Sequence, residues 1–178
     1  MKIKKLKFRE KHLNFLLLGF AIAFGVVVTS IAYHSYPREY VRNKTFEIYS
    51  SLFFVYERVR YPSNVEIVES KEGGMLLGFV TDPWNLNFGI IPTGGNFGTR
   101  HLKVFNSEDY KVRVNLRAYG DIKPLVTFSK NNFILAPNET AEVDIFLNTT
   151  NSTKPGNYTG EIDVIIKKPR LNILEIFL

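Results

Sequence analysis

Few residues in this chain have types and spacing suited to chemistry. The three histidines, His12, His34 and His101, are far apart in the sequence, and a single histidine is a poor metal site or general base. The glycine-rich run at 93–98 lacks the lysine of a phosphate-binding loop. The absence of cysteine excludes disulfides, thiol catalysis and cysteine-based metal sites. We therefore expect no enzymatic activity, no metal and no cofactor.

Candidate modification sites are more numerous. The sequence contains N-x-S/T sequons, which accept glycans only on an exported surface. Four of the five fall within twenty residues, although a polar, turn-rich segment would give the same pattern. Together with the absence of cysteine, they indicate an archaeal surface protein. The candidate acceptors are Asn43, Asn138, Asn148, Asn151 and Asn157.

The element that decides on which side of a membrane these residues lie is an uncharged stretch from Leu13 to Tyr33. As an α-helix it would be about 31 Å long, close to the hydrocarbon thickness of a bilayer. The twelve residues before it carry six basic side chains and one acid, and such a cluster stays in the cytoplasm. We therefore predict a cytoplasmic basic tail at 1–12 and a transmembrane signal-anchor at 13–36. The protein would cross the cell membrane once, with lipid around this helix and the remaining domain outside.

A cleaved signal peptide is the alternative for this stretch. Ser30, Ile31 and Ala32 have the small-x-small form of a cleavage site. The apolar run is at the long end for a signal peptide, which favours the uncleaved anchor.

The net charge argues against a nucleic-acid partner. The whole chain of 178 residues carries +6, of which the first twelve residues supply +5. The outer domain is therefore nearly neutral, whereas nucleic-acid-binding domains are strongly basic.

The segment at 37–62 is predicted to be a juxtamembrane amphipathic helix. Between Tyr40 and Val59 the apolar residues recur at helical spacing, and polar residues fill most of the opposite side. The dipeptide Tyr61-Pro62 would end this helix. Its aromatic and β-branched content keeps a strand as the alternative.

The residues from 63 to 169 read as an antiparallel β-sandwich, because short β-rich runs alternate with glycine and proline turns. Three runs alternate strictly between apolar and polar residues, as expected for sheets with one wet face. We expect Val114 and Ile162 to be buried, and Arg113 and Asp163 to be exposed. The predicted strands lie near 65–68, 75–81, 84–88, 100–105, 110–119, 122–128, 132–135, 141–147 and 158–167.

The order of the turn motifs in this region resembles a known family. A Phe88-Gly89 entry, a strand closing on Asn106, a turn at 135–139 and a Pro-Gly-Asn-Tyr-Thr-Gly hairpin at 155–160 follow one another. This is similar to the immunoglobulin-like sandwich modules of archaeal and bacterial surface proteins, and to related modules of spindle- and cilia-associated proteins and major sperm protein. One departure is Asn138, where the family commonly has glycine. The resemblance implies an immunoglobulin-like fold and a role in adhesion, assembly or scaffolding.

Two features suggest interaction surfaces. One is Trp84, the only tryptophan, which is either a core or edge aromatic or an anchor for a partner. The other is the apolar tail at 170–178, which is unusual because chain ends are normally polar. The tail could pack on its own domain, enter the outer membrane surface or bind a partner. Its candidate contact residues are Leu171, Ile173, Leu174, Phe177 and Leu178.

These features favour a membrane-anchored cell-surface protein with a structural or interaction role. Its partner would be an envelope or membrane protein, for example in an S-layer, a surface filament or a membrane complex. The alternative is a glycan-binding module or an accessory subunit of a membrane enzyme.

Overall fold

The computed structural model describes residues 17–24, 39–70 and 85–178, and it divides the chain into two compact units, Met1–Glu39 and Tyr40–Leu178. In the first unit, residues 17–24 are helical. Within the described ranges, no helix has both the length and the apolar character needed to cross a membrane. The predicted basic tail and most of the predicted anchor lie outside the described residues, so the anchor stays a prediction. Trp84 and the predicted strand at 75–81 also lie outside them.

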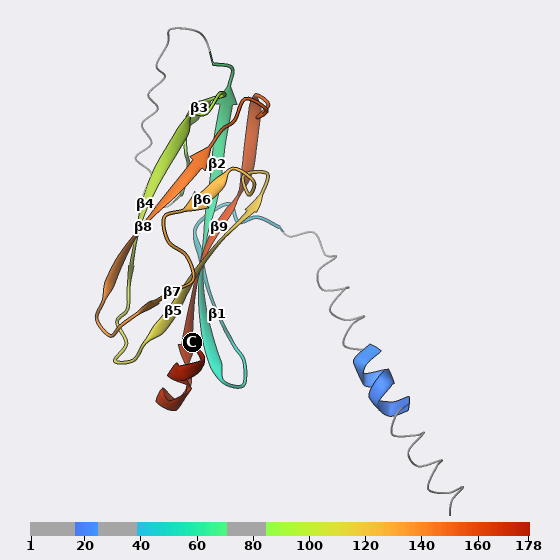
Figure 1. Ribbon diagram of the computed structural model, residues 1–178, viewed down its shortest axis with the longest axis vertical. Helices are drawn as coiled ribbons and strands as arrows, with labels where there is room; N and C mark the ends of the chain where they lie inside the picture. Colours follow the sequence, from blue (N-terminus) through green and yellow to red (C-terminus); the bar gives the residue numbers. More distant parts are fainter. Residues whose placement is uncertain (1–16, 25–38, 71–84) are drawn as a thin grey trace, which may run out of the picture. The chain divides into compact units, whose positions relative to one another are not determined.

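The second unit is built from strands (Figure 1). In its described part, a six-stranded sheet has the order β1-β2-β9-β5-β7, with β3 also pairing to β2, and a three-stranded sheet has the order β4-β8-β6. All neighbours are antiparallel except β2 and β3. The elements are β1 (Thr45–Ser50), β2 (Phe54–Val68), β3 (Ile90–Pro92), β4 (Phe97–Phe105), β5 (Val112–Gly120), β6 (Val126–Phe128), β7 (Phe133–Leu135), β8 (Thr140–Asn148), β9 (Gly156–Pro169) and the 3-10 helix η1 (Asn172–Phe177).

The two sheets share one buried core, to which both contribute alternate residues. Val143, Ile145 and Leu147 of β8 are fully buried, and they belong to the same cluster as Val114 and Ile162 of the larger sheet. Because successive strand residues point to opposite faces, one apolar residue in two is enough to fill this core. The predicted burial of Val114 and Ile162 is therefore confirmed, and so are the predicted strands that became β4 to β9.

The predicted helix at 37–62 is wrong. Residues 45–50 and 54–68 form the strands β1 and β2, which are paired from Thr45 and Arg60 to Ser50 and Val55. The turn between them is closed by the backbone amide of Ser51, which donates to the carbonyl of Phe54 at 2.8 Å. The β-branched and aromatic residues of the segment gain a long antiparallel ladder with β9, and this tertiary pairing overrides the helical spacing.

Tyr61-Pro62 also does not end an element, since β2 continues through it. The ladder between β1 and β2 ends at Arg60, and beyond it the Pro62 carbonyl accepts from the amide of Leu86 at 3.0 Å. Proline can therefore stand here, at a break in the pairing along that side of β2. The domain boundary expected at 62 falls inside the second unit, which begins at Tyr40.

Two expectations about charged residues also fail. Asp163 is fully buried, although it lies on the face of β9 away from the core, and Arg113 is half-buried. The reason is that β9 is a central strand flanked by β2 and β5. Their long side chains Arg60 and Arg117 lie beside Asp163 in register.

Asn106, the residue that closes β4, is buried because it ties three segments together. Its side-chain amide donates to the carbonyls of Tyr110 at 2.9 Å, Ala136 at 2.9 Å and Leu135 at 3.3 Å. Its Oδ1 accepts from the backbone amide of Glu108 at 3.1 Å. The side chain thus satisfies backbone groups that would otherwise be buried without partners.

Two backbone positions, one in a turn and one in a strand, follow their sequence chemistry. Asn138 has a φ of 57°, so asparagine holds the left-handed conformation that the family resemblance assigned to glycine. At Gly160, a Cβ atom would lie 2.0 Å from the carbonyl oxygen of Tyr119, so only glycine fits in this part of β9.

We expect Asn106→Ala to destabilise the domain by about 2–4 kcal/mol, because one buried and two partly buried carbonyls would lose their donor together. Asn157→Ala, at an exposed position on β9, should change stability by less than about 0.5 kcal/mol. Urea unfolding of the two variants measures the difference, and equal midpoints would contradict this role for Asn106.

Candidate functional site

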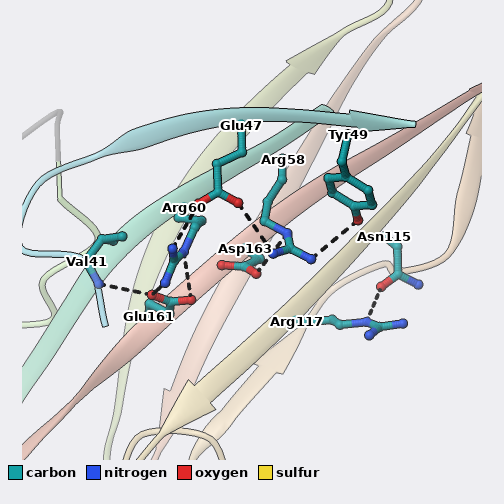
Figure 2. Close-up of polar contacts among 9 residues, drawn as sticks. All are labelled: Val41, Glu47, Tyr49, Arg58, Arg60, Asn115, Arg117, Glu161 and Asp163. Carbon is teal, nitrogen blue, oxygen red and sulfur yellow. Dashed lines mark hydrogen bonds and ion pairs between the residues drawn. The ribbon is translucent and has the colours of Figure 1, made fainter. Parts of the chain in front are cut away.

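A network of ion pairs around two buried carboxylates lies on the outer face of β1, β2 and β9 (Figure 2). Its centre is Glu161 on β9, whose side chain is fully buried. Arg60 on β2 binds both oxygens of this carboxylate, with Nε at 3.2 Å and Nη2 at 2.9 Å. The backbone amide of Val41 donates to the same carboxylate at 3.1 Å. Glu161 therefore fixes the start of the domain to the middle of the sheet.

Asp163, two residues along the same strand, is also fully buried, and its ion pair is longer than that of Glu161. The Nε atom of Arg58 lies 3.6 Å from its carboxylate. Glu47 on β1 connects both arginines, at 3.5 Å from Arg58 and 2.9 Å from Arg60. The network thus joins β1, β2 and β9 across the sheet.

The electrostatics of this network suit structure rather than proton transfer. Burial by itself would lower the pKa of Arg60, but the hydrogen bonds from its guanidinium to Glu161 and Glu47 outweigh burial and raise the pKa. A bidentate guanidinium–carboxylate pair holds its geometry and keeps both groups ionised. The arrangement can orient strands, but a general acid or base needs a pKa near the working pH.

A second ion cluster lies where β9 ends. Lys168 donates to Glu57 on β2 at 2.5 Å and to Glu108 in the β4–β5 loop at 2.6 Å. The hydrogen bond from Lys168 lowers the pKa of Glu108, against the opposing effect of burial. For Lys168, burial lowers the pKa, and its hydrogen bonds to both acids more than compensate and raise it.

His101 lies on an exposed surface, as its position in the strand predicted. Its Nδ1 is 2.6 Å from Asp144 of β8, and its side chain is 77% exposed. In the described ranges, no group of three or more histidine, aspartate or glutamate side chains is arranged to hold a metal ion.

All five candidate sequon asparagines are exposed. Asn148 ends β8, Asn151 follows it, and Asn157 is at the start of β9, so these three lie at one end of the domain. The end of β9 at Pro169 lies beside the β1–β2 turn, because Phe54 pairs with Pro169. Since a strand rises about 3.3 Å per residue, the two ends of the 14-residue β9 are about 40 Å apart.

The end of the domain opposite Asn148, Asn151 and Asn157 has an apolar tip, which we define as Leu52, Phe53, Leu171, Ile173, Ile176 and Phe177. Figure 1 shows the β1–β2 turn and η1 at this end. These side chains are 53–79% exposed. Two of them belong to the β1–β2 turn and four to the C-terminal segment. The sequence predicted contact residues in the tail, but it missed the turn because the segment was assigned to a helix. Of the other predicted contact residues, Leu174 and Leu178 are half-buried.

Backbone contacts hold the two parts of the tip together. The amide and Nε of Arg170 donate to the carbonyls of Phe53 and Ser51, both at 3.0 Å. Lys167 donates to the carbonyl of Phe177 at 2.8 Å, and Arg113 donates to the carbonyl of Leu178. The tail is therefore tied down by its backbone, while most of its apolar side chains face outward.

A third feature is the open edge of the larger sheet at β1. In the described part of the chain, β1 pairs with β2 on one side and with no strand on the other. Phe46 and Ile48 point to the core face of the sheet, in register with Val59 and Glu57, yet they are 58% and 62% exposed. The alternation of residues 45–50 could have revealed this edge if the segment had been assigned as a strand.

We expect Arg60→Met to cost about 3–5 kcal/mol, because it leaves the buried Glu161 carboxylate without its main cation. The double variant Arg60→Met/Glu161→Met should lose clearly less than the sum of the two single variants. A double-mutant cycle by chemical denaturation measures the coupling, and additive losses would show that the pair contributes nothing.

The lowered pKa of Glu108 predicts a pH dependence of stability. The ion pair contributes fully above the ordinary pKa of 4.5, and its contribution is lost as the pH falls through the lower pKa of the folded state. Glu108→Gln should therefore flatten the fall in stability below pH 4.5, whereas Glu66→Gln, at an exposed site on β2, should not. Thermal melts over that pH range would contradict this if both variants kept the slope of the unmodified protein.

The chain was compared with protein families, curated proteins and solved structures. No protein-family model, curated protein or solved structure matches this chain. The resemblance to surface sandwich modules therefore stays a prediction from the turn motifs.

Proposed function

We propose that this chain is a membrane-anchored structural protein of the cell envelope, with an immunoglobulin-like sandwich outside the membrane that binds another envelope protein. The anchor and its orientation follow from the apolar stretch at 13–33 and the basic residues before it. The two antiparallel sheets around one core are compatible with such a sandwich. An S-layer or surface-filament subunit is the kind of partner this location offers.

The observation that carries the proposal is the unprotected edge strand β1. Folded proteins usually guard exposed edge strands with lysine, proline or bulges. The sequence of β1, Thr-Phe-Glu-Ile-Tyr-Ser, has neither lysine nor proline, and its one charge, Glu47, already binds Arg58 and Arg60. By contrast, the long edge strand β4 of the smaller sheet carries Arg100, His101 and Lys103.

Strand addition is the binding mode that such an edge supports. The backbone of an incoming strand would extend the sheet, and the exposed Phe46 and Ile48 would contact its alternate side chains. The ion pairs of Glu47 hold β1 on β2, so the edge is already formed before binding.

A photo-reactive amino acid in intact cells tests this function. Phe46→p-benzoylphenylalanine should give an adduct with another envelope protein, because position 46 would face the added strand. The same substitution at Phe97, which is 67% exposed on β4, is the matched control and should give none.

The variant Ile48→Lys sharpens the test. A lysine at an edge opposes strand addition, so it should abolish the adduct formed from position 46 while the melting temperature stays nearly unchanged. Equal adducts from positions 46 and 97, or adducts that survive Ile48→Lys, would refute binding at β1.

A further inference from the structure

We propose that the apolar tip inserts into the interface of a lipid bilayer, so that the outer domain touches the membrane in addition to being tethered to it. The inference rests on the proposed membrane location, but it concerns other residues than the β1 edge. It assigns the tip to lipid rather than to a protein partner.

The tip has the composition of an interfacial segment. Its six side chains are 53–79% exposed and come from two segments that backbone hydrogen bonds hold together. Residues 50–55 carry no charge, and residues 171–178 carry only Glu175. Exposed apolar side chains at one end of a domain, next to basic residues, are what the apolar layer just below lipid headgroups accepts.

The backbone of the tip is also prepared for a medium with little water. Carbonyl groups that enter the hydrocarbon of a bilayer need donors from the protein, because no water is there to supply them. Lys167 supplies a donor to Phe177, Arg113 to Leu178, and Arg170 to both Ser51 and Phe53. A site built for aqueous exposure would not need these bonds, because water would satisfy the carbonyls.

Directly behind the tip lies a layer of aromatic and basic side chains. Lys167 places its ammonium 3.7 Å from the ring centroid of Phe54. The rings of Tyr49 and Tyr56 stack at 5.0 Å, and Arg58 lies over Tyr49. Tyrosine and basic side chains gather at the depth of lipid headgroups, where cations meet phosphate. Arg170, which is exposed, completes this layer with a positive charge.

Three of the five candidate glycan acceptors support the same orientation, whereas Asn138 lies in the turn before β8, toward the tip end of the domain. Asn148, Asn151 and Asn157 are exposed at the end of the domain away from the tip. Glycans are bulky and hydrophilic, so they fit the end that faces away from a membrane.

The absence of cysteine allows a direct test with the full chain. An environment-sensitive fluorophore attached through Ile176→Cys reports on the tip, and one attached through Ser152→Cys reports on the sequon end. Both proteins are reconstituted into vesicles of phosphatidylcholine and phosphatidylglycerol, with a quencher on part of the acyl chains close to the headgroup. We expect a blue-shifted, quenched signal at position 176 and a water-like, unquenched signal at position 152.

Matched variants identify the contact. Ile173→Ser in the tip should reduce the quenching at position 176, whereas Ile90→Ser, at an exposed isoleucine on β3 near the other end of β9, should leave it unchanged. A water-like signal at position 176 in vesicles, or one that becomes protected only in whole cells where proteins are present, would refute the lipid contact. Failure of the anchor is seen separately, because the protein would then not float with the vesicles.

Discussion

The long antiparallel ladder between β2 and β9 is the constraint on which the rest of the domain depends. It runs without interruption from the pair Phe54 and Pro169 to the pair Ile67 and Gly156. Because opposite residues share a face, this one register sends Tyr61, Ile162 and Val164 into the core. The same register puts Arg60 beside Asp163 on the other face, two pairs along the ladder from Glu161. A shift of one residue would exchange the apolar core for the ion pairs.

The ion pairs on the outer face are a consequence of this central position. A carboxylate between two neighbouring strands loses its contact with water, and the cost is several kcal/mol unless a cation with good geometry replaces the water. Arg60 does so with two hydrogen bonds to Glu161, and Glu47 connects it to Arg58. Buried ion pairs of this kind add little net stability, but they disfavour other registers of β1 against β2. They therefore explain how a short edge strand keeps its position.

Much of the sheet region could be predicted from the sequence, because its signals are local. Alternation placed the β5, β8 and β9 segments and the core residue Val114, and the turn chemistry of Asn138 was correct. The helix predicted at 37–62 was wrong because the apolar residues of this segment fit a helical period as well as a strand. Only the distant partner β9 decides between the two, and no local pattern contains that information. The predicted exposure of Asp163 was wrong for the same reason, since the polarity of residues along one strand does not tell whether that strand is central or at an edge of the sheet.

The wrong helix prediction also hid the two proposed contact surfaces, the β1 edge and the apolar tip. Only when residues 45–54 form a hairpin does β1 become a sheet edge, with Leu52 and Phe53 at the turn beside the C-terminal segment. The β1 edge and the tip then differ in which of their groups are exposed, backbone groups at the edge and apolar side chains at the tip. At β1 the edge has no strand partner among the described residues, so another strand suits it. At the tip, the carbonyls of Phe177, Leu178, Ser51 and Phe53 already have donors, and the exposed apolar side chains have no cover. A strand would bring further polar backbone to the tip, whereas lipid brings only apolar contact and headgroups for the cations behind it. This difference separates a protein contact at the edge from a membrane contact at the tip.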